Sequence, residues 1–314
     1  MTPPSLAEPA PASDNTAAGI ALRLAATGLF ASMSLCVRLA SFEAPVGQIV
    51  FWRSAVALVP IVIYLVIIGR FPAALATRNP LGHLRRSAFG CAAMFFSFLC
   101  LAYLPLALAT ALGFLAPLVA IPFAMFFLKE RPDPLVIGAA GLGFAGIGLM
   151  LAPAFNGPEP DLSTLLGVAA GLACAITTAS AKVEIKRLTA SEPAGTIAFY
   201  FALVCALAGL ATAPFGWSDA HGTTLLWLVG AGLCGGLAHI AMTEAVARAP
   251  VSTLAPFEYT AMIWAMGFDL AVFALVPAPL SLVGAVVVVA AAALVAFAPR
   301  LRFFRSSAAQ RMTP

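Results

Sequence analysis

Stretches of apolar residues long enough to cross a bilayer follow one another along the whole chain, separated by short polar or proline-rich segments. A membrane-spanning helix needs about 20 consecutive, mostly apolar residues. Prolines such as Pro45, Pro105 and Pro250 lie in the separating segments, where they end helices. We predict ten transmembrane helices, at residues 18–40, 47–69, 87–104, 107–128, 134–153, 163–185, 194–214, 224–246, 251–275 and 280–299.

The composition excludes the soluble globular class. Hydrophobic residues make up 62% of the 314 residues and charged residues only 10%, and the mean hydropathy is +1.00. A soluble protein has roughly 25% charged residues. The predicted fold class is therefore an all-α integral membrane protein.

The basic residues predict the orientation, because Lys and Arg accumulate in cytoplasmic loops. With the N-terminus inside, 15 of the 17 basic residues fall on the inner side, while Arg38 lies outside and Arg53 lies within the second span. We expect a multi-pass protein of the bacterial inner membrane with both termini in the cytoplasm. The inner set comprises Arg23, Arg70, Arg78, Arg85, Arg86, Lys129, Arg131, Lys182, Lys186, Arg187, Arg248, Arg300, Arg302, Arg305 and Arg311.

The chain divides into two halves between two tails. Residues 1–16 contain no Lys or Arg, so they lack the basic segment of a secretory signal and are expected to be a disordered cytoplasmic tail. Residues 300–314 are expected to be a basic cytoplasmic tail. The halves, residues 17–153 and 162–299, each contain five predicted helices.

Two local alignments suggest that the halves are repeats. EAPVGQIVFW from Glu43 is similar to EPAGTIAFY from Glu192. At one constant offset, Pro105 falls on Pro250, Pro132 on Pro277 and Phe114 on Tyr259. Because five is an odd number, the second repeat must be inverted in the membrane, an arrangement typical of secondary transporters.

Four further stretches are informative: PVGQIVFWRS (45–54), LPLALATALGFLAPL (104–118), FFLKERP (126–132) and APVSTLAPFEYTAMIWA (249–265). With them the sequence resembles the EamA-type branch of the drug/metabolite transporter superfamily, over roughly residues 18–299. The resemblance implies a transporter, similar to members that take up S-adenosylmethionine or riboflavin.

The resemblance also implies an acidic residue shortly before a proline at the end of the fourth span of each repeat. Glu130 before Pro132 matches this pattern. The second half departs from it, because residues 273–276 read Phe-Ala-Leu-Val before Pro277, where the family usually has a Gly-Glu pair. A function that depends on a carboxylate at that position is therefore in doubt for this chain.

Ionisable residues within the predicted spans are the candidates for binding or coupling, because burying them in a bilayer costs several kcal/mol. Glu258 either binds a cationic group or a proton, or is a structural partner of Arg53 or Tyr259. Arg53 either binds a carboxylate or phosphate, or pairs with Glu258, or extends its charged end outward. His239 either titrates near the depth of Glu258 or is a packing residue.

Other polar, glycine and aromatic positions in the spans are weaker candidates for a functional role. Asp269 is expected to be solvated near the outer interface, three helical turns beyond Glu258. Two polar clusters at span ends are interpreted as interfacial anchors or an inner gate: Lys182, Glu184, Lys186 and Arg187 on the sixth span, and the Glu244–Arg248 pair on the eighth. Glycines of the fifth and eighth spans permit close helix packing, within the chain or at a homodimer seam. Four aromatic residues either line a pocket or pack in the core: Trp52, Tyr200, Tyr259 and Trp264.

We expect a secondary active transporter that moves a small organic metabolite by alternating access, coupled to protons or to exchange. The metabolite is amino-acid-like, nucleoside-like or vitamin-like, and an exporter of the same family is the alternative. The alternatives from a different functional class are a channel and an intramembrane enzyme. The sequence contains no Walker A motif for ATP hydrolysis and no GxSxG or HExxH motif of an enzyme. The expected partners are the solute and the lipid bilayer, without nucleic acid, cofactor or metal ion.

Overall fold

The computed structural model describes residues 16–77, 79–116, 118–119, 134–155, 161–188, 191–192, 194–249, 254, 257–291 and 293–294. Within these ranges the chain forms helices and loops without β-strands, as the all-α prediction requires. Both predicted tails, apart from Thr16, and the acidic match at Glu130 lie outside the described residues.

Six described helices are long and apolar enough to cross a membrane. They are α1 (Thr16–Ala40), α2 (Val46–Ile67), α3 (Pro80–Tyr103), α7 (Leu162–Leu188), α8 (Ala194–Leu210) and α9 (Gly222–Arg248). The other elements are α4 (Leu106–Gly113), α6 (Pro134–Phe155), α11 (Thr260–Phe273), a helix at Pro279–Ala291, and the 3-10 turns η1 (Ala73–Leu75) and η2 (Ala213–Phe215).

The main correction to the predicted boundaries concerns α3. This helix begins at Pro80, not at residue 87, because Asn79 caps it by accepting a hydrogen bond from the Gly82 amide at 2.9 Å. Arg85 and Arg86, predicted to lie in a cytoplasmic loop, are therefore inside the helix. The hydropathy pattern missed this turn because its polar residues lower the local average.

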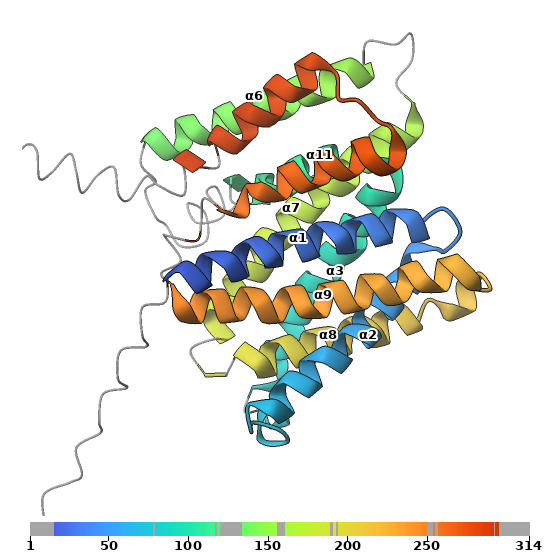
Figure 1. The fold of residues 1–314 in the computed structure, drawn as a ribbon, viewed down its shortest axis with the longest axis vertical. Coiled ribbons are helices and arrows are strands. Elements are labelled where there is room, and N and C mark those ends of the chain that lie inside the picture. Colours follow the sequence, from blue (N-terminus) through green and yellow to red (C-terminus); the bar gives the residue numbers. More distant parts are fainter. Residues whose placement is uncertain are drawn as a thin grey trace, which may run out of the picture.

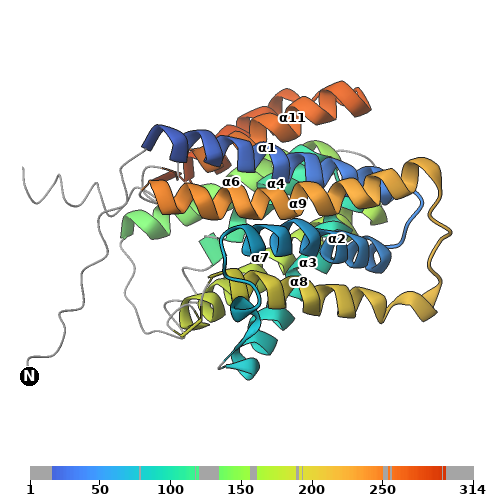
Figure 2. The ribbon, with the colours of Figure 1, turned by 60° about the horizontal axis from the view of Figure 1, so that its bottom comes forward.

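Helices α1 and α9 run side by side, whereas α3 and α7 are steeply inclined to them (Figures 1 and 2). Helix α1 packs along α9, α3 packs along α7, and α2 contacts both α8 and α9. The start of α1 and the end of the last described helix lie at the same end of the bundle (Figure 1).

Glycines of α9 allow its close approach to α2, as predicted. A Cβ atom on Gly236 would lie 3.1 Å from the carbonyl oxygen of Ala57, and one on Gly232 would lie 3.2 Å from that of Arg53. This glycine face is therefore occupied within the chain by α2.

Large apolar side chains cover the outside of the bundle. Ile63 on α2, Leu207 on α8 and Ile263 on α11 are more than half exposed. Soluble monomers rarely expose such continuous apolar surface, whereas a lipid bilayer is its natural environment. The chain is a multi-pass membrane protein.

Candidate functional site

A cavity of about 420 Å³ lies between the two halves of the chain. Ligand pockets typically measure 300–1,000 Å³, so this volume suits a small metabolite. Its wall combines apolar and aromatic residues with hydroxyl groups and charges of both signs. The lining residues are Phe30, Ala31, Ser34, Ser97, Leu101, Ala109, Thr110, Gly113, Phe114, Ala116, Thr178, Lys182, Glu258, Tyr259 and Ala261.

Two helix interruptions border this central cavity. Helix α4 ends at Gly113, Phe114 forms a turn, and residues 115–116 are helical again. Residues 257–258 are helical, Tyr259 forms a turn, and α11 begins at Thr260. The rings of Phe114 and Tyr259 lie 5.6 Å apart between centroids, so the two interruptions meet at the cavity.

Glu258 lies at the second interruption, directly before α11, where the positive end of the helix dipole favours a carboxylate. Its Oε1 atom lies 3.1 Å from Nη2 of Arg23 on α1. The side chain of Glu258 is 58% exposed and that of Arg23 only 11%. The predicted alternative in which Glu258 pairs with Arg53 is wrong, because the packing of α1 against the start of α11 brings Arg23 to this carboxylate instead.

Lys182 on α7 also lines the central cavity. The sequence interpretation grouped it with the helix-end charges, but its neighbour Glu184 faces elsewhere, bonding Arg187 at 2.9 Å and Arg85 at 3.5 Å. One sequence feature could have separated Lys182 from the others: it lies one helical turn before Lys186, deeper in the predicted sixth span. The cavity is therefore lined by one acidic and one basic residue, Glu258 and Lys182.

Arg53 and His239 form a second site between α2 and α9. Arg53 is only 4% exposed, and its Nη2 atom donates a hydrogen bond to Nε2 of His239 at 3.2 Å. Because an arginine can only donate, His239 is a neutral acceptor with its proton on Nδ1. Phe30 lines the central cavity and packs edge-on against His239 at 5.1 Å, so its ring lies between this pair and the central cavity.

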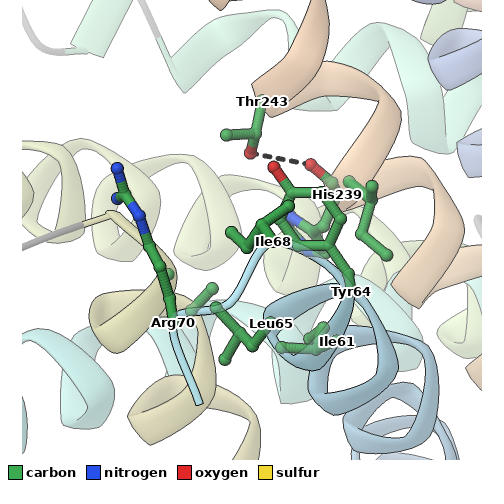
Figure 3. Close-up of a pocket in the computed structure, with 10 residues that line it drawn as sticks. Ile61, Tyr64, Leu65, Ile68, Arg70, His239 and Thr243 are labelled. Atoms are coloured by element: carbon green, nitrogen blue, oxygen red, sulfur yellow. Dashed lines mark hydrogen bonds between the residues drawn. The ribbon is translucent and has the colours of Figure 1, made fainter. Parts of the chain in front are cut away.

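A smaller cavity of about 140 Å³ opens beside His239 (Figure 3). Tyr64 and Arg70 from α2 and the loop after it line this cavity opposite Thr243 of α9. Tyr64 also donates a hydrogen bond to Glu244, which forms the predicted ion pair with Arg248.

Of the four predicted aromatic residues, Tyr259 alone lines the central cavity. Tyr200 donates a hydrogen bond to the carbonyl of Leu75 at 2.8 Å. Trp52 packs edge-on against Phe51. Trp264 lies against Gly28 and is 45% exposed.

Asp269 is not solvated, in contrast to the prediction. It is only 2% exposed, and its carboxylate accepts hydrogen bonds from the amides of Leu106 at 3.0 Å and Ala107 at 2.8 Å. These are orphan amides of the first turn of α4. Asp269 therefore caps α4 from a distant part of the chain, while Arg38 donates to the carbonyl of Leu104 beside it.

The six cysteines are free thiols, and the described residues contain no group of three or more His, Cys, Asp or Glu side chains that could hold a metal ion.

Comparisons with known proteins agree with this architecture. Residues 17–152 match the EamA-like transporter family. A solved crystal structure has a TM-score of 0.63 at 20% identity, covering 88% of this chain and 96% of its own, which establishes the shared fold.

Two sets of relatives have names that describe transport. The pseudopaline exporter CntI of Pseudomonas aeruginosa is 28% identical over 87% of this chain and 94% of its own length. The S-adenosylmethionine uptake transporter of Rickettsia felis is 26% identical over 89% and 90%. Residues 17–152 are thus similar to the EamA-like transporter family, and the names of both relatives describe membrane transport.

Proposed function

We propose that the chain is a secondary transporter that carries a small organic metabolite through the central cavity by alternating access. The observation that carries this proposal is the pair of helix interruptions at Phe114 and Tyr259, which meet at a cavity with charges of both signs. Interrupted helices near the midplane are the usual binding elements of secondary transporters.

The transporter is built, in this proposal, from ten spans in two inverted repeats of five. Reciprocal contacts of aligned positions support it. A Cβ atom on Gly47 would meet Thr212 near the end of α8, and one on Gly195 would lie 3.0 Å from Leu65 near the end of α2. The α1–α9 and α3–α7 pairings are also equivalent under an exchange of the halves.

An even number of spans agrees with the arrangement in Figure 1, where the first and last described helices begin and end at the same end of the bundle. Together with the distribution of basic residues, this supports cytoplasmic termini and insertion in the bacterial inner membrane.

The substrate, in this proposal, is a metabolite with both an amine and an acidic group, as amino-acid-like solutes have. Glu258 offers a carboxylate that is open to the cavity, and Lys182 offers an ammonium group. An incoming amine would compete with Arg23 for Glu258, so binding and the α1–α11 contact are linked. One relative is named an exporter and another an uptake protein, so either direction of transport agrees with the comparisons.

The test is counterflow of radiolabelled amino-acid-like, nucleoside-like and vitamin-like solutes in proteoliposomes, with wild type, Glu258→Gln and Glu184→Gln. A carrier gives saturable counterflow with at least one solute, and Glu258→Gln reduces it at least tenfold. Glu184→Gln is the matched control, because Glu184 faces Arg85 and Arg187 outside the cavity. Strictly linear flux would contradict a carrier, and full activity of Glu258→Gln would remove Glu258 from the mechanism.

A further inference from the structure

A cationic pocket lies beside the central cavity, between α2, α3, α7, α8 and α9. It has a volume of about 150 Å³ and is lined by Arg53, Arg86 and His239, with otherwise apolar walls that include Phe201. Arg86 places its guanidinium over the ring of Phe201, 3.9 Å from the centroid.

The charges of this pocket have no acidic partner among the described residues. The ion pairs found there join other arginines, namely Arg23, Arg85, Arg187 and Arg248, to carboxylates. Arg53 instead contacts His239 and the sulfur of Met33, at 3.2 and 3.5 Å. Two guanidinium groups of like charge at the same cavity are costly in a membrane unless an anion compensates them.

Donor groups in the pocket remain available for a ligand. Nε and Nη1 of Arg86 are buried and donate to no hydrogen-bond partner within the described residues. His239 is neutral, since its Nε2 accepts from Arg53, so it adds no third charge. Guanidinium groups bind carboxylate and phosphate through paired N–H donors.

Small residues leave room beside both guanidinium groups. A Cβ atom on Gly235 would lie 3.1 Å from Nε of Arg53. A Cβ atom on Gly90 would meet the guanidinium of Arg86 and lie 2.7 Å from Phe201. Gly235 of α9 therefore lies against Arg53 of α2, and Gly90 lies one turn after Arg86 on the same helix, α3.

The pocket adjoins the cavity of Figure 3, because the two cavities share Ile61, Ala198 and His239. That neighbouring cavity is lined by the exposed Arg70. Basic residues therefore line both of these adjacent cavities.

We propose that the Arg53–Arg86 pocket binds an oxyacid anion, a carboxylate or a phosphate group. The volume admits such a group but falls below that of a typical pocket for a whole metabolite. The anion is either a free solute or the headgroup of an anionic lipid, and both offer the same oxygen atoms to the guanidinium groups.

Thermal unfolding of the purified full chain in phosphatidylcholine nanodiscs tests the proposal without relying on transport. Inorganic phosphate and acetate are each titrated against chloride at equal ionic strength, so that general screening is matched. A ligand that binds the folded state raises the unfolding temperature. We expect phosphate or acetate to raise it saturably above the chloride reference.

The variants Arg53→Gln and Arg86→Gln should raise the anion concentration needed for half-maximal stabilisation about 10- to 100-fold, as expected for the loss of hydrogen bonds to a charged group. Arg85→Gln is the matched control, because Arg85 is adjacent on α3 but its side chain is 53% exposed and paired with Glu184; its response should equal that of wild type. Arg53→Lys keeps the charge and replaces Arg53→Gln if that variant does not fold.

A second arm replaces phosphatidylcholine with phosphatidylglycerol. If phosphatidylglycerol stabilises the wild type and soluble anions do not, the bound anion is a lipid headgroup. Loss of this stabilisation in the Arg53 and Arg86 variants would support anion binding by the pocket. The proposal is overturned if neither soluble anions nor the anionic lipid stabilises the wild type, or if all variants respond as wild type does.

Discussion

The rings of Phe114 and Tyr259 lie 5.6 Å apart, and each residue interrupts a helix. The same two residues coincide when the halves of the sequence are aligned. Equivalent residues that contact each other across a two-fold arrangement lie at its axis. The proposed repeat axis therefore passes between these two rings, at the edge of the central cavity.

Replacing these aromatic residues should affect stability as a coupled pair. The double-mutant cycle of Phe114→Ala and Tyr259→Ala is expected to give a coupling free energy of about 0.5–1.5 kcal/mol, as for other aromatic pairs. Denaturant unfolding in mixed micelles measures it. Transport should fall in both single variants, whereas Trp264→Ala, outside the cavity, should lower stability without a comparable loss of transport. Additive effects of the two substitutions would contradict a contact between the rings.

Removing the cap of α4 should destabilise the fold. Asp269→Ala leaves the amides of Leu106 and Ala107 without their acceptor, and the loss of a helix cap costs about 0.5–2 kcal/mol. Asp161→Ala removes the carboxylate that accepts from the amide of Ser163 at an exposed helix start and should have the smaller effect. Equal unfolding midpoints for Asp269→Ala and wild type would show that the cap is dispensable.

Adding a methyl group at Gly235 should displace Arg53. The new Cβ would lie 2.9 Å from Sδ of Met33, and 3.1 Å from Nε and 3.3 Å from Nη2 of the Arg53 guanidinium. Crowding of this kind costs about 1–3 kcal/mol. Gly138→Ala is the control, since nothing lies within 4 Å of its added Cβ and the helix gains up to about 1 kcal/mol. Unfolding midpoints should therefore shift in opposite directions, and a stabilised Gly235→Ala variant would argue against the tight contact.

The proposed orientation predicts which loops react from outside the cell. Single cysteines in place of Phe42 and Asp219, between spans on the outer side, should react with a membrane-impermeant maleimide on intact cells. Cysteines in place of Ala76 and Ser191, on the inner side, should react only after permeabilisation. Wild type gives the background of its six native thiols. The reverse labelling pattern would show that the termini lie outside the cell and would contradict the proposed orientation.

Hydropathy and proline placement predicted most helix positions because a bilayer imposes a minimum apolar length. Pro45 and Pro105 directly precede α2 and α4, as expected. The early start of α3 was missed because its cap, Asn79, acts through local hydrogen bonding that a hydropathy average does not register.

The partners of the charged residues could not be predicted, because they depend on which helix faces pack together. Glu258 was recognised as a candidate, but its contact with Arg23 requires α1 to lie against the start of α11. The position of Asp269 on the chain gave no indication that it reaches the amides of α4. Lys182 was assigned to a helix end because sequence spacing does not show which residues line a cavity.

Helix α1 carries Arg23, Phe30 and Met33 along its length, and these residues contact Glu258, His239 and Arg53 respectively. One helix therefore contacts charged residues at both cavities, and a rigid displacement of α1 would change all three contacts together. A fluorescent or spin label on its exposed face would register events at either cavity in a single signal.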